Sequence, residues 1–257
     1  DINTSSFSIS TSSTLVFNGG NININGSFTA GLSSGGVVSG TTVINLLGTG
    51  TWSGDLAVSN TININTSGTL TISGAISKGT GQLNYISGTV VTTGSTLNLS
   101  GATCTLDVGS IDWYNVTVNV NNTTTLNSAL NITNTLRILA NAVTFNGSFS
   151  WTCLNLVTIN SASLLNRTLT LQAGNTYRVD GYFNSECTNP TYRYIYQSSS
   201  STVRANLILT TGGTQRVINT SATRIDSSTG ETIYTSDGTL LSDVNWGIRG
   251  GSMLLLF

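Results

Sequence analysis

Apolar and polar residues alternate along this chain in short segments, which is the pattern of strands that bury one face. Representative segments are Thr61-Ile62-Asn63-Ile64, Thr69-Leu70-Thr71-Ile72 and the Val116, Val118, Val120 alternation. Between such segments stand corners such as Ser67-Gly68 and Asn121-Asn122. Gly and Asn supply the positive φ that a sharp corner needs. The pattern therefore predicts an all-β protein.

Short strands joined by such corners suit either a β-sandwich or a β-solenoid. The strands repeat one pattern, in which Thr or Asn alternates with an apolar residue, and charged residues are scarce. The corners are too short for Greek-key crossovers. These three observations favour the solenoid. No repeat of fixed length runs through the chain, so we predict an irregular parallel β-helix (β-solenoid). The one window with helical spacing, residues 136–143 (LRILANAV), lies among Asn and Thr residues and lacks a cap. We predict strand there as well.

Charge is almost missing from the first part of the chain. From Ile2 to Leu106 the only charged side chains are those of Asp55 and Lys78. Charged residues make up 7% of the whole chain, whereas soluble proteins average about a quarter. In parallel strands about 4.8 Å apart a charge would lie above its own copy, whereas Thr and Asn form hydrogen-bonded ladders. We therefore expect like residues to stack on like from coil to coil.

The composition changes near Gly174. Most Arg and Tyr residues lie beyond it, together with Pro190 and both Glu residues. A solenoid needs an end that does not offer bare strand edges to other chains. We therefore divide the chain into a charge-poor solenoid shaft, residues 1–172, and a C-terminal β-rich cap or interaction head, residues 173–257.

Net charge and hydropathy exclude some classes of partner. The formal net charge of −1 argues against a nucleic-acid binder, which needs a basic surface. No apolar run approaches the roughly 20 residues of a membrane span. The apolar tail is far shorter, and we interpret it as a packing element or oligomer interface: Met253, Leu254, Leu255, Leu256 and Phe257. The sequence shows no signal-peptide pattern, and because it begins with Asp1 a processed N-terminus stays open.

Several segments resemble the β-helical fibre and surface proteins of tailed bacteriophages, with related repeats in secreted bacterial adhesins. The segments are 48–54 (GTGTWSG), 113–119 (WYNVTVN), 125–133 (TLNSALNIT), 169–177 (LTLQAGNTY), 225–230 (IDSSTG) and 243–247 (DVNWG). The resemblance covers most of the chain from Thr42 to Trp246. It implies a parallel β-helix and a role in attachment or virion structure, and it implies no catalytic residue or cofactor.

The residue inventory restricts enzymatic chemistry. The chain has no His, which removes the usual general base and the Ser-His-Asp and Cys-His arrangements. Lys78 is the only Lys, in a segment that reads as a polar turn. The acidic turn at residues 226–231 (DSSTGE) lacks the spacing of known calcium loops. We therefore predict no metal or cofactor.

Paired carboxylates and thiols are the remaining reactive groups. Paired carboxylates serve most glycosidases, and three pairs are candidates, although isolated turn and cap carboxylates explain them as well: Asp107 with Asp112, Asp180 with Glu186, and Asp237 with Asp243. The three cysteines lack metal-ligand spacing and suit buried apolar positions, with a disulfide as the alternative: Cys104, Cys153 and Cys187.

The strongest candidate for an interaction surface is the segment from Tyr192 to Tyr196. Tyr192, Arg193, Tyr194 and Tyr196 combine the residue types favoured as interface anchors, and the alternation puts the three tyrosines on one strand face. The alternative is a cap that packs these rings into its own core.

These observations favour a non-enzymatic structural and attachment protein at the virion surface. We expect a fibre, spike or other surface component that is a homotrimer, since a closed oligomer would bury the apolar tail. The expected partners are other virion proteins and a host-surface glycan or protein. The alternatives are a secreted bacterial adhesin module and a β-helical polysaccharide-degrading enzyme with paired carboxylates.

Overall fold

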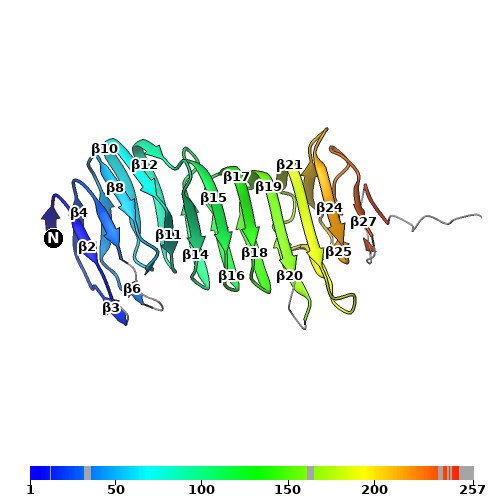
Figure 1. The fold of residues 1–257 in the computed structure, drawn as a ribbon, viewed down its shortest axis with the longest axis horizontal. Coiled ribbons are helices and arrows are strands. Elements are labelled where there is room, and N and C mark those ends of the chain that lie inside the picture. Colours follow the sequence, from blue (N-terminus) through cyan, green and yellow to red (C-terminus); the bar gives the residue numbers. More distant parts are fainter. Residues whose placement is uncertain are drawn as a thin grey trace, which may run out of the picture.

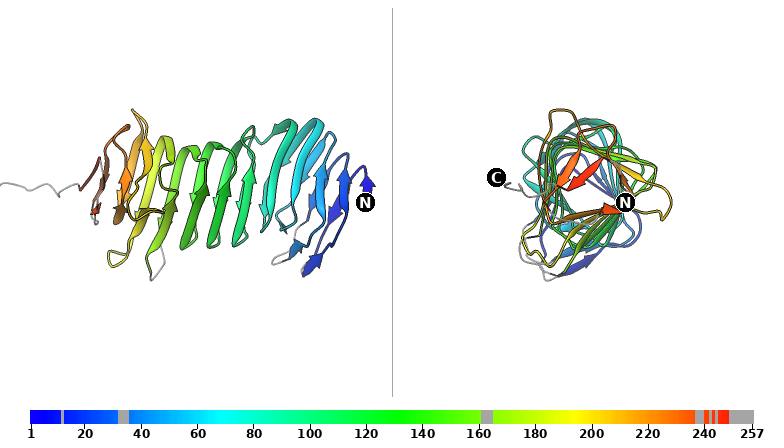
Figure 2. Two further views of the ribbon diagram at one scale, coloured as in Figure 1. Left: turned by 180° about the vertical axis from the view of Figure 1, so that it is seen from behind. Right: turned by 90° about the vertical axis from the view of Figure 1, so that its right-hand side faces the viewer.

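A computed structural model describes residues 1–11, 13–31, 36–160, 165–236, 240–241, 243 and 245–248. Throughout this part of the chain the regular structure is β-strand, and strand pairs run parallel. The strands stack along one axis into an elongated rod (Figure 1), and the view from its end shows the chain winding around that axis (Figure 2). The prediction of an all-β parallel solenoid is confirmed.

Two long sheets and one small sheet contain the strands. The first sheet consists of β1 (Ile2–Thr4), β4 (Asn21–Ile24), β7 (Val43–Leu46), β10 (Ile62–Ser73), β12 (Gln82–Val91), β14 (Thr103–Asp107), β16 (Asn122–Leu126), β18 (Ala142–Gly147), β20 (Arg167–Leu171), β22 (Tyr194–Ser198), β25 (Thr220–Thr223) and β28 (Leu240–Leu241), with β2 (Phe7–Ile9), β5 (Phe28–Ala30) and β8 (Gly50–Ser53) as a side branch.

The second sheet consists of β3 (Thr14–Val16), β6 (Val37–Ser39), β9 (Ala57–Val58), β11 (Ala75–Lys78), β13 (Thr96–Leu99), β15 (Asp112–Val118), β17 (Leu130–Ile138), β19 (Trp151–Asn160), β21 (Thr176–Cys187), β23 (Ala205–Leu209), β24 (Thr214–Ile218) and β26 (Ile225–Asp226). The small sheet pairs β27 (Ile233–Thr235) with β29 (Trp246–Ile248).

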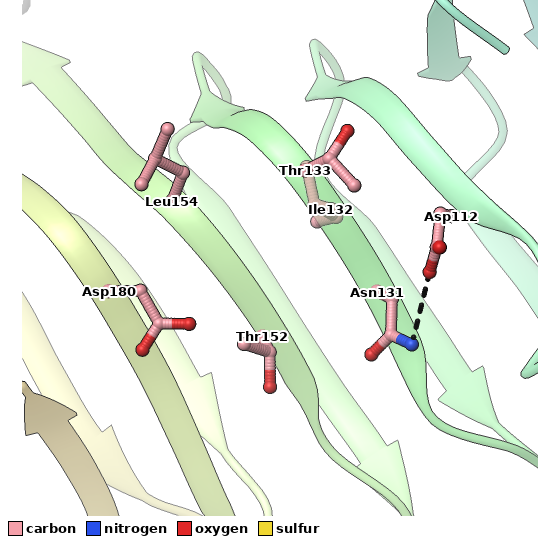
Figure 3. A pocket seen from close by; sticks show the side chains of 7 residues that line it. All are labelled: Asp112, Asn131, Ile132, Thr133, Thr152, Leu154 and Asp180. Atoms are coloured by element: carbon pink, nitrogen blue, oxygen red, sulfur yellow. Dashed lines mark hydrogen bonds between the residues drawn. The ribbon is translucent and has the colours of Figure 1, made fainter.

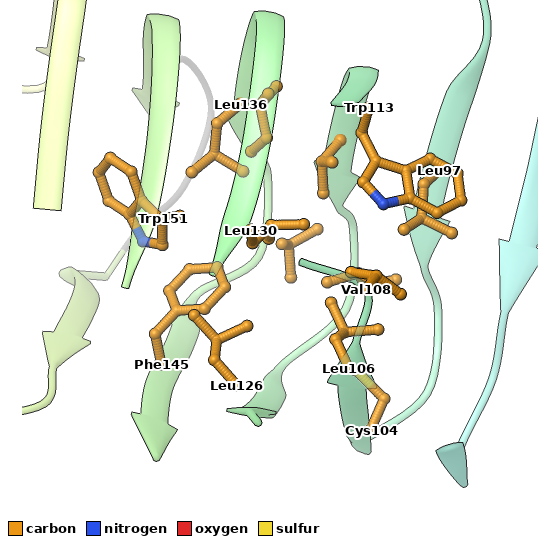
Figure 4. Close-up of a cluster of buried hydrophobic side chains, with 14 of the residues drawn as sticks. Leu97, Cys104, Leu106, Val108, Trp113, Leu126, Leu130, Leu136, Phe145 and Trp151 are labelled. Atoms are coloured by element: carbon orange, nitrogen blue, oxygen red, sulfur yellow. The ribbon is translucent and has the colours of Figure 1, made fainter. Parts of the chain in front are cut away.

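The alternating pattern places columns of apolar side chains on the inner face of the sheets. Ile22, Ile44 and Ile62 occupy successive register positions, and each is at most 1% exposed. Burying one such side chain contributes roughly 1.5–3 kcal/mol. The interior is continuous along the rod, and Figure 4 shows its middle part, where Trp113 and Trp151 lie among stacked leucines.

Asparagines stack outside the same sheet, as the scarcity of charge predicts. Asn23, Asn45, Asn63 and Asn84 each donate from Nδ2 to Oδ1 of the asparagine one coil earlier, at 2.8–3.0 Å, and the series starts at Asn3. We call these five residues the asparagine ladder. A carboxylate or ammonium repeated at these positions would repel its neighbours about 4.8 Å away.

Corners rely on glycine where coils approach closely. Gly54 has φ +93°, and a Cβ built there would lie 1.9 Å from the carbonyl oxygen of Ala30 in the preceding coil. Any other residue at position 54 would force the two coils apart.

The remaining predictions on secondary structure have different outcomes. The window 136–143 belongs to β17 and β18, with a short turn between them, so the prediction of strand is confirmed. Both long sheets continue past residue 172 without a break in strand order. The division into shaft and cap therefore stays a prediction based on composition.

At the far end Trp246 packs against Phe183 and Tyr196.

Candidate functional site

The tyrosine segment is largely part of the core. Tyr194 and Tyr196 are 0% exposed. Tyr196 packs edge-on against Phe183 with ring centroids 5.5 Å apart, and its hydroxyl lies 2.6 Å from Oγ1 of Thr158. Burial raises the pKa of both tyrosines. The prediction that Tyr194 and Tyr196 belong to an exposed surface is wrong, because their strand turns this face inward.

Tyr192 and Arg193 precede that strand and are only partly buried. The Arg193 guanidinium donates to the carbonyl oxygens of Pro190 at 2.7 Å and Tyr192 at 3.1 Å, which fixes it on its own turn. Their role in binding stays a prediction. The predicted oligomer interface, Met253 to Phe257, lies outside the described residues.

A shallow groove on the second sheet is a candidate site. Its volume is about 320 Å³, and it is lined by Asp112, Asn131, Ile132, Thr133, Thr152, Leu154 and Asp180. These residues come from four successive coils, β15, β17, β19 and β21, so the groove runs along the rod (Figure 3). We call it the corner groove.

Stacked irregularities in the strands create the corner groove. The pairing of β15 with β17 shifts register between Trp113 and Asn115, and the β17–β19 and β19–β21 pairings shift at the equivalent places. Such bulges bend a strand and redirect a side chain. Because the bends coincide in successive coils, they form one continuous corner. Leu154 is left 43% exposed there.

The groove also presents hydrogen-bonding groups, which are spaced one coil apart beside the exposed Leu154. Asp112, Asn131 and Thr152 occupy one register column, and Asn131 Nδ2 donates to Asp112 Oδ1 at 3.4 Å. Asp180 forms an ion pair of 2.6 Å with Arg178. A carboxylate, an amide and hydroxyls suit a hydroxyl-rich or peptide-like ligand that lies along the rod.

The two groove carboxylates are too far apart for the geometry of glycosidases. Three strand spacings separate β15 from β21, and Asp180 lies two residues beyond Arg178, which is in the register column of Asp112. The backbones of Asp112 and Asp180 are therefore more than about 14 Å apart. Paired catalytic carboxylates lie about 5–10 Å apart. The corner groove therefore suits binding better than hydrolysis by this pair.

The carboxylate pairs proposed from the sequence are not brought together as pairs by the contacts of the described residues. Asp107 lies in β14 of the first sheet and Asp112 in β15 of the second. Asp180 pairs with Arg178, whereas Glu186 accepts two hydrogen bonds from Arg216, at 2.9 and 3.1 Å. Arg216 lowers the pKa of Glu186.

The third pair is only half described. Asp237 lies outside the described residues, and Asp243 accepts a hydrogen bond of 2.7 Å from the backbone N–H of Ile225. This contact gives Asp243 a structural role at the end of the rod.

Lys78 lies in the interior rather than in a polar turn. It ends β11, is 0% exposed, and donates from Nζ to the carbonyl oxygens of Val58, Asn60 and Thr80. Burial lowers the pKa of Lys78 to about 7, and nearby Cys104 acts in the opposite direction. The residue is a structural clamp between coils, since its amine has no open path to a substrate.

The cysteines are buried free thiols, as expected for apolar core positions. Burial raises the pKa of the Cys104 and Cys153 thiols, which disfavours the reactive thiolate. Among the described residues no group of three or more Cys, Asp or Glu side chains is placed to hold a metal ion. The same residues include no helix long and apolar enough to cross a membrane.

Individually, most residues of the corner groove carry no recognisable signal in the sequence. Asn131, Thr133 and Thr152 look like ordinary strand residues, and Leu154 reads as a core position. The available signal was the spacing of about 20 residues between Asp112, Asn131 and Thr152, which corresponds to one coil in this region.

Comparison with known proteins adds no relative. No family model, no curated protein and no solved structure matches this chain.

Proposed function

We propose that this protein is a non-enzymatic structural and attachment component of a virion surface, a fibre, spike or similar part of a tailed bacteriophage. The observation that carries the proposal is the uninterrupted stack of parallel coils with its uncharged asparagine ladder. Such a stack pairs most of its strand backbone from coil to coil and extends without a large globular core. The resemblance of its segments to phage β-helical proteins supports the same role.

The corner groove is the surface through which we propose that the rod contacts a host. Its polar column, its exposed Leu154 and its length over four coils suit an extended surface glycan or a protein segment. Tyr192 and Arg193 lie beyond it along the chain and are the second candidate contact.

We further propose a homotrimer as the assembled form. A closed ring of three chains would bury the apolar tail at residues 253–257. Light scattering of the purified chain would then give a mass three times 26.8 kDa, and a mass of one chain at all concentrations would contradict this part of the proposal.

Sedimentation with host cells tests attachment. Fluorescently labelled protein is mixed with cells of the producing host strain, and the bound fraction is measured as a function of concentration. Thr152→Arg fills the corner groove with a long charged side chain and is expected to weaken binding at least tenfold. Thr125→Arg, a half-exposed threonine on the first sheet, is the matched control and should bind like the unmodified protein. If the unmodified protein and both variants bind equally, the corner groove is not the contact surface. If none of the three proteins binds, the proposal that the protein attaches to host cells is contradicted.

A further inference from the structure

The rod becomes abruptly narrower between β12 and β14. The chain takes 12 residues to pass from Asn84 to Thr96, but 8 residues to pass between their register partners in the next coil, Asp107 and Asn115. β14 consequently pairs with β12 over three residues, which are the first three of β12 (Gln82–Asn84) and the last three of β14 (Thr105–Asp107). The rest of β12 has β10 on one side and, among the described strands, none on the other.

This step exposes apolar side chains in the middle of the rod. Leu70 is 0% exposed, whereas Val90, its register partner one coil later, is only partly buried. Ile86 is 57% and Val91 39% exposed. We call residues 86–91 of β12 the ledge.

The ledge lacks the side chains that protect many strand edges. Natural proteins guard exposed edges with charges, Lys or Pro, as well as with bulges, and residues 82–91 (QLNYISGTVV) contain no charged residue and no Pro. The pairing with β10 is irregular between Tyr85 and Thr89 and regular from Thr89 to Val91. Tyr85 donates from Oη to the carbonyl oxygen of Gly88 at 2.6 Å, which occupies one backbone acceptor. The segment Thr89–Val91 is paired regularly with β10 and remains a template for a further strand on its other side.

We propose that the ledge binds the apolar C-terminal tail, residues 253–257, of a second copy of this chain as an added strand. The tail is a run of five apolar residues (MLLLF), and neither the ledge nor those five residues contain a charged side chain. Main-chain hydrogen bonds would supply affinity, and Ile86, Val90 and Val91 would contact alternate side chains of the tail.

The chain's own tail is too short to reach the ledge. β29, which ends at Ile248, pairs with β27 at the same end of the rod as β28 (Figure 1). Seven strand spacings separate β28 from β12 in the first sheet, which is about 34 Å. The nine residues after Ile248 span about 30 Å when fully extended, before any length is used for pairing. The occupant must therefore come from another copy.

A tail-to-ledge contact joins two different surfaces of the chain, so the interface is heterologous. Copies joined in this way form a closed ring only if the rotation from one copy to the next brings the last copy back to the first. The contact is compatible with the proposed trimer. It does not depend on a role in a virion, so a failure of host attachment leaves it intact.

Binding of a synthetic peptide tests the contact directly. A fluorescent peptide of residues 249–257 is titrated against a chain that ends at Ile248, and anisotropy is recorded. We expect saturable binding. Ile86→Lys and Thr89→Lys, which place charges on exposed positions of the ledge, should each weaken it at least tenfold. Val203→Lys changes a side chain that is 51% exposed elsewhere and should have no effect. A peptide with Leu255→Pro should bind poorly.

Self-association of the full chain is the second measurement. Light scattering should show a multimer that is lost when residues 249–257 are removed and weakened by the two ledge variants. If the peptide binds saturably and its affinity is the same for the two ledge variants as for the unmodified ledge, the ledge is not the binding site. Association that survives removal of the tail but is lost in the ledge variants would assign the ledge to another occupant, such as the ledge of a second copy, and would also overturn the proposal.

Discussion

At the scale of single residues, burial decides what each polar group can do. Lys78 illustrates this, because it is the only lysine and it lies inside the rod with three carbonyl acceptors. Tyr194 and Tyr196 illustrate it as well, since their rings fill the interior. Alternation in the sequence indicates that two tyrosines share a face, but it does not say which face is inside.

Lys78 makes stability depend on pH. Its pKa falls from 10.5 in the unfolded chain to about 7 in the folded one. Between these values the unfolded chain holds a proton that the folded chain lacks, so the free energy of unfolding contributed by this group rises with pH from 7 towards 10.5. Urea unfolding of the protein and of Lys78→Met at pH 7 and pH 9 measures this contribution. The difference between the two proteins should shift by about 1–3 kcal/mol in favour of the unmodified protein at pH 9. A difference that does not change with pH would show that Lys78 has the same protonation state in both forms.

At the scale of strands, register explains both the strength and the irregularity of the fold. The asparagine ladder follows from residues at one position of successive strands, whereas the corner groove follows from bends that coincide in β15, β17 and β19. The ladder could be anticipated from composition. The bends could not, although an asparagine stands at each of them: Asn134 donates from Nδ2 to Asn115 Oδ1 at 2.9 Å and Asn155 donates to Asn134 Oδ1 at 3.3 Å. Asparagine is too common in this chain for these three to indicate a bend in advance.

The asparagine ladder should be strongest in its middle. Asn45 takes part in two ladder hydrogen bonds and Asn3 in one. Replacing Asn45 with Ala should lower the free energy of unfolding by about 1–3 kcal/mol, and Asn3→Ala should cost roughly half as much. Urea denaturation of both variants checks the ratio, and an equal loss would mean that the ladder bonds contribute no net stability.

A leucine of the interior and a leucine of the groove should respond differently to truncation. Leu106 is 0% exposed and Leu154 is 43% exposed. Leu106→Ala should therefore destabilise the protein by about 2–5 kcal/mol, and Leu154→Ala should change stability by about 0.5 kcal/mol or less. Thermal and urea unfolding of the two variants are the measurements. Similar losses would show that Leu154 packs in the interior.

At the scale of the whole molecule, the sequence predicts the architecture far better than the site. Period-two alternation, glycine corners and the lack of charge all arise from local strand physics, which a single sequence displays. Contacts between coils depend on the number of residues in each coil, and this number varies from coil to coil. The pair of Asp107 and Asp112 shows the consequence, since five residues along the chain place them in different sheets.

We propose that this rod belongs to the surface of a virus particle. Immunogold electron microscopy with antibodies to the purified chain tests it most directly, on particles purified from the producing culture and on the cells and supernatant of that culture. We expect gold on projecting parts of intact particles. Gold confined to bacterial surfaces, or antigen that stays in the supernatant when particles are sedimented, would contradict it and favour a secreted adhesin.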